Sequence, residues 1–162
     1  MTKPSAPIET RPPAAPRRPV RLAVRAVVLQ HGRLLIVNAW HDAASDLWCA
    51  PGGGVEPGSS LPENLIREVA EETGLTIAVD SPCLVNEFHD PHGDFHQCDV
   101  YFRARIVAGR LDDGWRDPAG VVSRRRFVTA AELQGLRHKP DSLAAAAWGA
   151  GLLYDPLEPI LR

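Results

Sequence analysis

The sequence predicts an α/β domain in which helices pack on a mixed β-sheet. Runs of β-branched and aliphatic residues recur along the chain, and segments with helical capping signals are interleaved with them. The chain has 162 residues, of which 44% are hydrophobic, so it is close to the usual size of one domain and can bury one core. We therefore expect a single layered domain.

Residues 1–19 are expected to form a disordered tail. Their composition is dominated by proline and arginine, which bury little apolar surface and favour an extended, solvated backbone. The arginines suit either an anionic partner or a simple disordered leader, and the leader is favoured. The folded domain is predicted to span residues 20–162.

The first strands are predicted where the composition changes at Val20. Residues 20–30 and 33–40 are two apolar runs separated by His31-Gly32, a pattern typical of a β-hairpin. Residues 51–58 follow as a Gly-rich loop, in which the glycines permit close approaches that a Cβ atom would block.

A helix is predicted from about Leu61 to Thr73. Ser60 and Glu63 have the spacing of a capping box at its start, and Gly74 stands where a helix ends on a left-handed residue. One side of this helix is apolar and should pack on the sheet. The apolar residues are Leu61, Leu65, Ile66 and Val69.

The rest of the chain alternates further strands with two short helices. Thr129 and Glu132 form a second capping box before a short helix, and residues 140–149, with Asp141 or Ser142 as N-cap, favour another helix. The predicted strands are residues 75–79, 83–90, 96–109 and 124–128.

The polar face of the 61–73 helix carries three carboxylates. Glu68 and Glu72 are one turn apart and Glu71 lies beside both. Like charges at this spacing destabilise a helix by roughly 0.2–0.5 kcal/mol per pair, and carboxylates near its C-terminal end oppose the helix dipole. A bound cation would offset both effects. Carboxylate and carbonyl oxygens favour Mg²⁺ or Mn²⁺, and Mg²⁺ of this kind usually accompanies substrate phosphates.

Residues 53–75 resemble the Nudix box, which has a glycine, five residues, a glutamate, seven residues and then Arg-Glu-apolar-x-Glu-Glu-x-Gly-apolar. The residues in register are Gly53, Arg67, Glu68, Val69, Glu71, Glu72, Gly74 and Leu75. Ser59 departs from the pattern, because it replaces the first glutamate. The resemblance implies that this glutamate would brace the arginine through an ion pair. Glu63, four residues before Arg67 on the same helix, is expected to take that role here. The resemblance implies the Nudix fold, an α/β/α sandwich with a mixed β-sheet.

The same resemblance implies a metal-dependent hydrolase that cleaves the diphosphate bond of a nucleoside diphosphate linked to another group. Glu68 and Glu72 are the first expected metal ligands, with the carbonyl of Gly52 as a third. Glu71 would bind a second metal or orient the attacking water, so Glu71, Glu68 and Arg67 are the expected catalytic residues. The general base lies either on the helix or on a later loop. The loop candidates are Asp112, Asp113 and Asp117.

Substrate-binding residues are expected on the strands and loops around the box. Trp40 and His41 could stack on a base, and Arg25 could contact phosphate, although each is equally compatible with packing or surface positions. Phe88 opens a His- and Asp-rich segment, for which a substrate-side loop is favoured over a second metal site. The acidic and histidine residues there are His89, Asp90, His92, Asp94 and His96.

Two weaker signals accompany these residues. Pro91 lies 16 residues after Leu75, a spacing that resembles ADP-ribose-cleaving relatives. Residues 124–126 are three arginines, which form either a basic patch near the cleft or a solvated strand edge.

Three other functions stay open. Ser59 supports a catalytically weak or inactive Nudix-like domain that senses a nucleotide or metabolite. An isomerase of isoprenoid diphosphates would need further active-site residues, and Cys49 is near the box. Nucleic-acid binding through the tail is disfavoured by the net charge of −2 and the lack of a basic helix.

The cellular setting is predicted from cysteine usage and hydropathy. Three cysteines without a C-x-x-C pair favour a reducing cytoplasm, and no apolar run is long enough to span a membrane. The expected partner is a nucleotide-like small molecule, and the resemblance leaves room for a homodimer.

Overall fold

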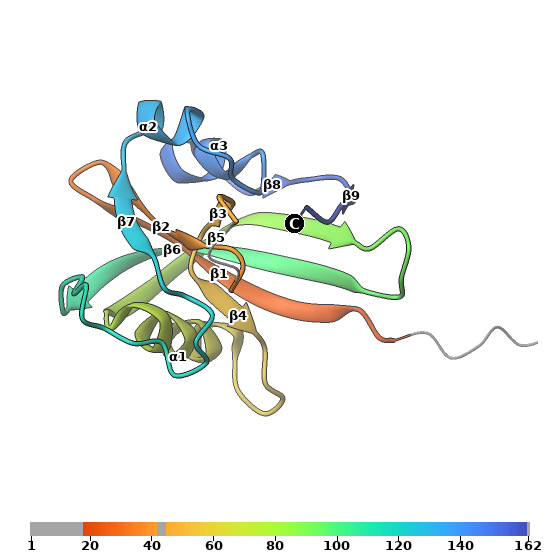
Figure 1. Cartoon of the computed structure of the whole chain (residues 1–162), viewed down its shortest axis with the longest axis horizontal. Coiled ribbons are helices and arrows are strands. Elements are labelled where there is room, and N and C mark those ends of the chain that lie inside the picture. Colours follow the sequence, from red (N-terminus) through yellow and green to blue (C-terminus); the bar gives the residue numbers. More distant parts are fainter. Residues whose placement is uncertain (1–17, 42–44, 162) are drawn as a thin grey trace, which may run out of the picture.

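The computed structural model describes residues 18–41 and 45–161 (Figure 1). Most of the predicted tail, residues 1–17, lies outside the described residues. The helices are α1 (Leu61–Thr73), α2 (Ala130–Gln134) and α3 (Leu143–Trp148). α1 covers one face of the β-sheet, while α2 and α3 lie on the other side, so the expected α/β/α sandwich is confirmed.

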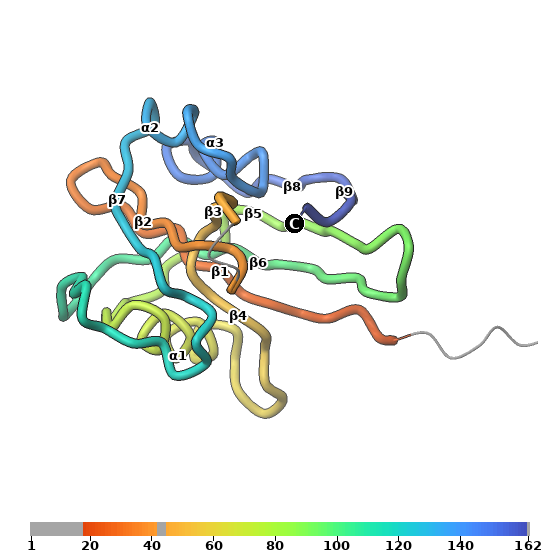
Figure 2. Tube along the Cα trace, in the orientation of Figure 1, coloured from red at the N-terminus to blue at the C-terminus, as the bar shows by residue number. Residues whose placement is uncertain are grey.

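The sheet is mixed, as predicted. Its strands are β1 (Arg21–Gln30), β2 (Arg33–Asn38), β3 (Trp48–Cys49), β4 (Gly52–Gly54), β5 (Thr76–His89), β6 (His96–Ala108), β7 (Arg125–Val128), β8 (Leu153–Tyr154) and β9 (Glu158–Pro159). The main order across the described residues is β3-β2-β1-β6-β5-β8, and β4, β7 and β9 pair with β1, β2 and β5. β1 and β6 run parallel, whereas β5 and β6 form a long antiparallel hairpin whose path Figure 2 follows.

The two faces of the sheet carry separate parts of the core. Side chains alternate along a strand, so neighbours in sequence point to opposite faces. Val24 of β1 belongs to the cluster that includes Leu65 of α1. Val27 belongs to the other cluster, together with Tyr101 of β6 and Leu143 of α3.

No helix in the described ranges is long and apolar enough to cross a membrane.

The predicted hairpin turn and the two predicted capping boxes are confirmed. His31 and Gly32, with φ angles of 50° and 73°, join β1 and β2 as a tight hairpin turn requires. α1 begins at the capping box of Ser60 and Glu63 and ends at Gly74, whose φ is 73°. Thr129 and Glu132 cap α2 in the same way. These local rules therefore set where α1 begins and ends and where α2 begins. Ser142 precedes α3, as one of the two predicted N-caps, but its side chain makes no capping hydrogen bond.

Three predicted features of the elements were wrong. The Gly-rich stretch is not only a loop, because residues 52–54 form β4 against β1. A Cβ atom on Gly52 would lie 2.0 Å from the carbonyl oxygen of Val24, so glycine permits this pairing. The strands predicted at 75–79 and 83–90 are one strand, β5, with irregular register in its middle. Ile66 is not part of the buried stripe of α1, since it is 37% exposed.

Candidate active site

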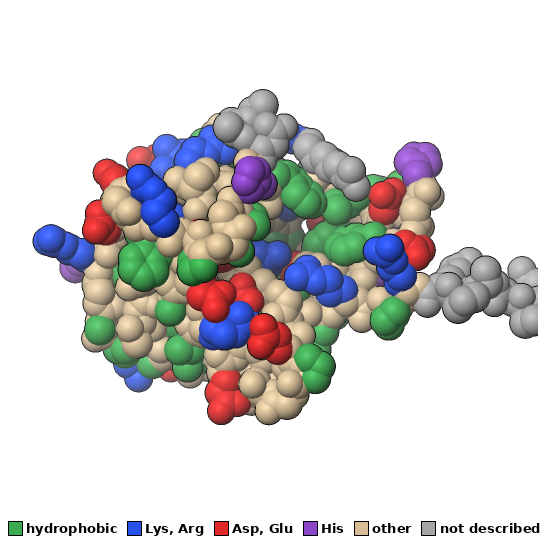
Figure 3. Space-filling model, turned by 60° about the horizontal axis from the view of Figure 1, so that its bottom comes forward, with side chains coloured by type: hydrophobic (Ala, Val, Ile, Leu, Met, Phe, Trp, Pro, Cys, Tyr) green, Lys and Arg blue, Asp and Glu red, His purple; other side chains and the backbone are tan. Residues whose placement is uncertain are grey.

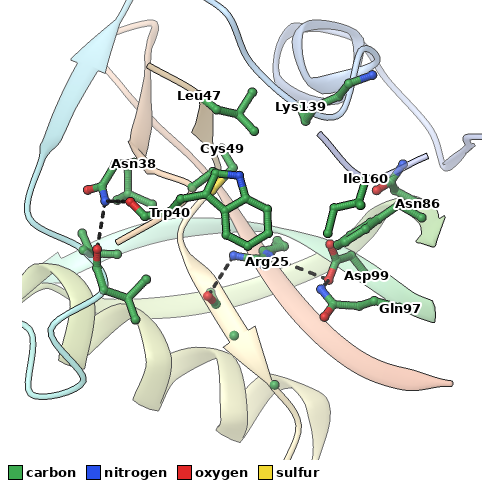
Figure 4. Close-up of a pocket in the computed structure, with 18 of the residues that line it drawn as sticks. Arg25, Asn38, Trp40, Leu47, Cys49, Asn86, Gln97, Asp99, Lys139 and Ile160 are labelled. Carbon is green, nitrogen blue, oxygen red and sulfur yellow. Dashed lines mark hydrogen bonds and ion pairs between the residues drawn. The ribbon is translucent and has the colours of Figure 1, made fainter. Parts of the chain in front are cut away.

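A pocket of about 570 Å³ connects the carboxylate face of α1 to the sheet. Glu68, Glu71 and Glu72 line it, together with the β4 glycines. In Figure 4 α1 lies on one side of the pocket, and Trp40 and Ile160 lie on the opposite side. The surface in Figure 3 is hollowed, with acidic and basic side chains gathered beside the hollow.

Glu72 is the most deeply buried of the three carboxylates, at 8% exposure. Its Oε2 accepts a hydrogen bond of 2.8 Å from the backbone N–H of Gly52. Burial raises the pKa of Glu72 to about 8, although the nearby Arg25 charge and this hydrogen bond oppose the rise. A carboxylate in this position is best stabilised in its charged form by a cation.

Glu68 lies directly against the glycine strand. A Cβ atom on Gly53 would be 2.2 Å from Glu68 Oε2, so only glycine leaves room for this side chain. Burial raises the pKa of Glu68, and the Arg67 charge opposes the rise. Arg67 Nη1 lies 2.9 Å from Glu68 Oε1 and 3.4 Å from Glu71 Oε2, so one guanidinium contacts both carboxylates.

The brace of Arg67 differs from the expected one. Glu63 does not take this role, because its carboxylate accepts a 2.8 Å hydrogen bond from the backbone N–H of Ser60. Glu56 does so instead, with Oε1 3.6 Å from Arg67 Nη2, and Asn64 Oδ1 accepts a 3.2 Å hydrogen bond from the same nitrogen. Arg67 is thus paired with a carboxylate from the loop before the helix.

Arg25 occupies the centre of the pocket floor (Figure 4). Its Nη1 donates a 2.9 Å hydrogen bond to the carbonyl of Gly52, and its Nε lies 3.7 Å from Asp99 Oδ1. Burial opposes the charged guanidinium, but Asp99 and other negative groups raise the pKa of Arg25 above its usual value. The predicted phosphate contact of Arg25 stays a prediction, since part of its hydrogen-bonding capacity serves the protein.

The oxygen atoms of Glu68, Glu71, Glu72 and the Gly52 carbonyl are chemically suited to bind a hard divalent cation. Carboxylate and carbonyl oxygens are the ligands that Mg²⁺ prefers, and glycines leave space beside Glu68. The described residues nevertheless contain no group of three His, Cys, Asp or Glu side chains already arranged to hold a metal. A cation would therefore compete with Arg67 for Glu68 and Glu71.

The predicted substrate-binding residues all line this pocket: Arg25, Trp40, His41 and Phe88. Trp40 is fixed in the wall, because its Nε1 donates a 3.0 Å hydrogen bond to the carbonyl of Leu161. His41 is exposed, and Phe88 lies beside Phe95 with 5.9 Å between ring centroids. Their contact with a substrate stays a prediction.

The loop carboxylates differ in position. Asp112 and Asp113 are exposed, whereas Asp117 is buried and lines the pocket. Asp117 Oδ2 accepts hydrogen bonds from the backbone N–H groups of Val121 and Val122, at 3.0 and 2.8 Å. Asp117 is thus the one of these three candidates near the carboxylate wall, and it also holds its own loop.

The arginines at 124–126 do not form a patch on the cleft. Arg124 and Arg126 lie over the ring of Trp48, 5.2 and 4.8 Å from its centroid. Arg125 donates to the carbonyls of Trp115 and Val122. Their role in the structure is packing and loop attachment.

The histidines lie at the β5–β6 hairpin. The ring centroids of His89 and His96 are 6.4 Å apart, and His92 is exposed in the turn. His89 and His96 line a separate pocket together with Pro91. The second metal site is not supported, because no metal-holding group of side chains occurs in the described ranges.

Three buried polar residues on the pocket floor were missed: Asn86, Gln97 and Asp99. The sequence contains a signal for two of them, because apolar residues alternate along 96–109. Gln97 and Asp99 lie at the alternate positions and therefore share the other face of the strand.

The chain matches the model of the NUDIX domain over residues 19–148. It belongs to the Nudix family. Bacillus subtilis YjhB is 29% identical over 125 residues, which are 75% of this chain and 57% of that protein. An ADP-ribose pyrophosphatase of Methanocaldococcus jannaschii is 30% identical over 95 residues, 57% of this chain and 55% of that protein. This Nudix chain thus spans little more than half the length of these relatives.

Solved structures support the fold. The crystal structure of a UDP-X diphosphatase superposes with a TM-score of 0.67, covering 89% of this Nudix chain and 71% of that chain at 19% identity. At this identity the likeness concerns the fold alone.

Proposed function

We propose that this Nudix protein hydrolyses the diphosphate bond of a nucleoside diphosphate linked to another moiety, with Mg²⁺ or Mn²⁺ as cofactor. The observation that carries the proposal is one pocket that joins the carboxylate face of α1 to a partly apolar chamber. A diphosphate with its metal suits the first part, and a nucleoside suits the second. The names of similar proteins, including an ADP-ribose pyrophosphatase, support this reaction class.

The proposed ligands are those expected from the box: Glu68, Glu72, Glu71 and the carbonyl of Gly52. When bound, the metal supplies charge stabilisation to the phosphate oxygens and lowers the pKa of a bound water. Gly52 holds Glu72 through its N–H, and Arg25 holds the Gly52 carbonyl, so the backbone keeps these oxygens in place. We propose that Arg67 orients Glu68 and Glu71 for catalysis.

The general base is assigned to Glu71 in this proposal. It is less buried than Glu72, and it lines the pocket. Asp117 is the second candidate, but two backbone N–H groups already bind one of its oxygens. Glu71 would take a proton from a water whose oxygen attacks one phosphorus. The bond between that phosphorus and the bridging oxygen would break, and the leaving group would depart as a phosphate that keeps this oxygen.

A substrate panel tests the proposal. Nucleoside triphosphates, dinucleoside polyphosphates, ADP-ribose, nucleotide sugars and NADH are incubated with the full chain, with phosphatase coupling to release inorganic phosphate. Reactions contain Mg²⁺, Mn²⁺ or a chelator. Metal-dependent cleavage of at least one compound is expected, and no cleavage despite demonstrated metal binding would overturn the proposal.

A sensor without hydrolysis is the second candidate, and Ser59 is the observation that favours it. The brace by Glu56 counts against it, because Arg67 remains paired without the usual glutamate. Binding of an unhydrolysed compound from the panel would support the sensor. Conversion of an added isoprenoid diphosphate into an isomer that keeps its diphosphate, with no release of phosphate, would point to the isoprenoid isomerase instead.

We further propose a cytoplasmic location and a homodimer. The thiols of Cys49, Cys83 and Cys98 are free in the structure, which is compatible with a reducing compartment. Light scattering after size-exclusion chromatography measures the oligomeric state, and a mass near 17.6 kDa would contradict the dimer.

A further inference from the structure

The floor of the pocket contains a pair of polar side chains that the diphosphate chemistry does not use. Asn86 of β5 and Asp99 of β6 are cross-strand partners, and both are 2% exposed. They line the pocket together, on the face of the sheet turned away from α1 (Figure 4). Polar groups in the middle of a sheet cost free energy unless they are paired, so this pair needs an explanation.

Asp99 is fixed by its neighbours. Gln97 Nε2 donates a 2.8 Å hydrogen bond to Asp99 Oδ1, and Arg25 Nε lies 3.7 Å from the same oxygen. Gln97 is itself held by Arg21, whose Nη1 donates to Gln97 Oε1. The carboxylate therefore has a defined orientation, and both contacts engage Oδ1.

Asn86 is the unexplained member of the pair. Its Nδ2 is buried and, among the residues that the structure describes, has no hydrogen-bond partner. A buried amide without a partner is destabilising, and such groups in native structures usually have a functional reason. Asn86 stands in register with Asp99, so a donor and an acceptor lie next to each other.

The surfaces around this pair indicate the shape of the ligand. Trp40 and Ile160 bound the same space with apolar side chains (Figure 4). Apolar walls suit the two faces of an aromatic ring. The space therefore combines apolar walls with a polar floor.

We propose that Asp99 and Asn86 read the hydrogen-bonding edge of a nucleobase. Asp99 accepts an N–H of the base, and the Asn86 amide donates to the neighbouring acceptor on the same edge. This inference rests on the proposed function and deepens it, because it makes the nucleobase the recognised part of the substrate. Arg25, which contacts Asp99 and the Gly52 carbonyl, lies between the base end and the metal end.

The test is a binding measurement that does not depend on hydrolysis. The 5′-monophosphates of adenosine, guanosine, uridine and cytidine are titrated calorimetrically into the full chain in the presence of a chelator. Purine riboside 5′-monophosphate, which lacks the exocyclic amine, and ribose 5-phosphate complete the set. We expect one or more of the four nucleotides to bind at least about tenfold more tightly than ribose 5-phosphate, because the base supplies the contacts.

Two variants locate the recognition. Asp99→Asn and Asn86→Ala should each weaken the preferred nucleotide by about tenfold or more and leave ribose 5-phosphate unchanged. Asn86→Ala is the second variant because Asp99→Asn also removes the charge beside Arg25. Asp80→Asn makes the same chemical change at an exposed position of β5 and should bind as the wild type does.

The outcomes distinguish a failure of the nucleobase inference from a failure of the proposed hydrolase. Wild-type affinity in both pocket variants, or no preference of the wild type for any nucleotide over ribose 5-phosphate, would overturn it. If the nucleotides bind with the expected losses but nothing is hydrolysed, the inference stands and the proposed hydrolase fails. If hydrolysis occurs equally well in the pocket variants for every base, the hydrolase stands and the inference fails.

Discussion

The carboxylate of Glu56 lies 3.6 Å from the guanidinium of Arg67, although the two residues belong to different segments. Glu56 belongs to the loop between β4 and α1, and Asn64 Oδ1 joins them by accepting from the Glu56 N–H at 2.9 Å. The loop and the helix therefore form one polar network around Arg67. We expect this network to replace the contact that a glutamate at position 59 would make.

The first prediction concerns this replacement. Glu56→Ala should lower kcat/KM several-fold, because an exposed pair of this kind is worth up to about 1 kcal/mol. Adding Ser59→Glu to that variant should recover most of the rate. Initial rates over a series of Mg²⁺ concentrations measure both effects. A double variant no better than Glu56→Ala would show that position 59 cannot reach Arg67.

The second prediction concerns Glu72. Glu72→Gln should nearly abolish metal-dependent turnover, because the neutral amide is a poor ligand for a divalent cation. The amide oxygen can still accept from the Gly52 N–H, so circular dichroism and thermal unfolding should report an intact fold. Asp80→Asn is the matched control and should keep wild-type turnover. An unchanged rate in Glu72→Gln would refute the metal assignment.

The third prediction compares two adjacent glycines. Gly53→Ala should reduce activity more than stability, because its Cβ atom would meet the movable carboxylate of Glu68 at 2.2 Å. Gly52→Ala should also lower the free energy of unfolding, since φ is 144° and the clash is with the backbone of Val24. Backbone strain of this kind costs about 1–3 kcal/mol.

Urea unfolding and steady-state rates of both glycine variants make the comparison. Equal losses of stability would contradict it. Equal stability with full activity in Gly53→Ala would mean that Glu68 does not need its present position.

The fourth prediction concerns the N-cap of α1. Ser60→Ala should lower the free energy of unfolding by about 1 kcal/mol, because the hydroxyl accepts from the N–H of Glu63. The neighbouring Ser59→Ala should change it by less than about 0.5 kcal/mol. Urea denaturation at neutral pH measures both. Similar values for the two serines would contradict the capping role.

The same cap has a pH dependence, which makes the fifth prediction. The backbone N–H and hydroxyl of Ser60 lower the pKa of Glu63. A carboxylate with a lowered pKa in the folded state stabilises the fold above its unfolded pKa, and the stabilisation is lost as pH falls through the folded value. Glu63→Gln should therefore show a smaller loss of stability below pH 4.5 than the wild type. Parallel curves would rule out this contribution.

Local signals in the sequence were sufficient for α1 and for the β1–β2 turn. Capping boxes, a terminal glycine and a two-residue turn act within a few residues, so the pattern around Ser60 and Gly74 predicts the structure directly. Helical spacing likewise predicts that the three carboxylates share one face of α1. The pocket around them depends on pairing between distant strands.

The residues of the pocket floor could not be predicted from such local signals. Asn86 and Asp99 meet only because β5 and β6 pair in one particular register, which residue spacing alone does not supply. The brace was mispredicted for a similar reason. Glu63 has a helical spacing to Arg67, but the backbone N–H of Ser60 is a nearer partner for its carboxylate. The β8 and β9 pairs are only two residues long, and such short strands carry little sequence pattern.

The alternation of β6 divides its residues between the two faces of the sheet. Phe102 belongs to the core on the α1 side, while Asp99 and Gln97 contact the pocket. A substitution of Asp99 or Gln97 leaves the packing beneath α1 untouched, whereas Tyr101, on the same face of β6, belongs to the other core cluster and also lines the pocket. Mutation could therefore change the choice of ligand through the two polar positions of this face, while Tyr101 continues to hold the core together.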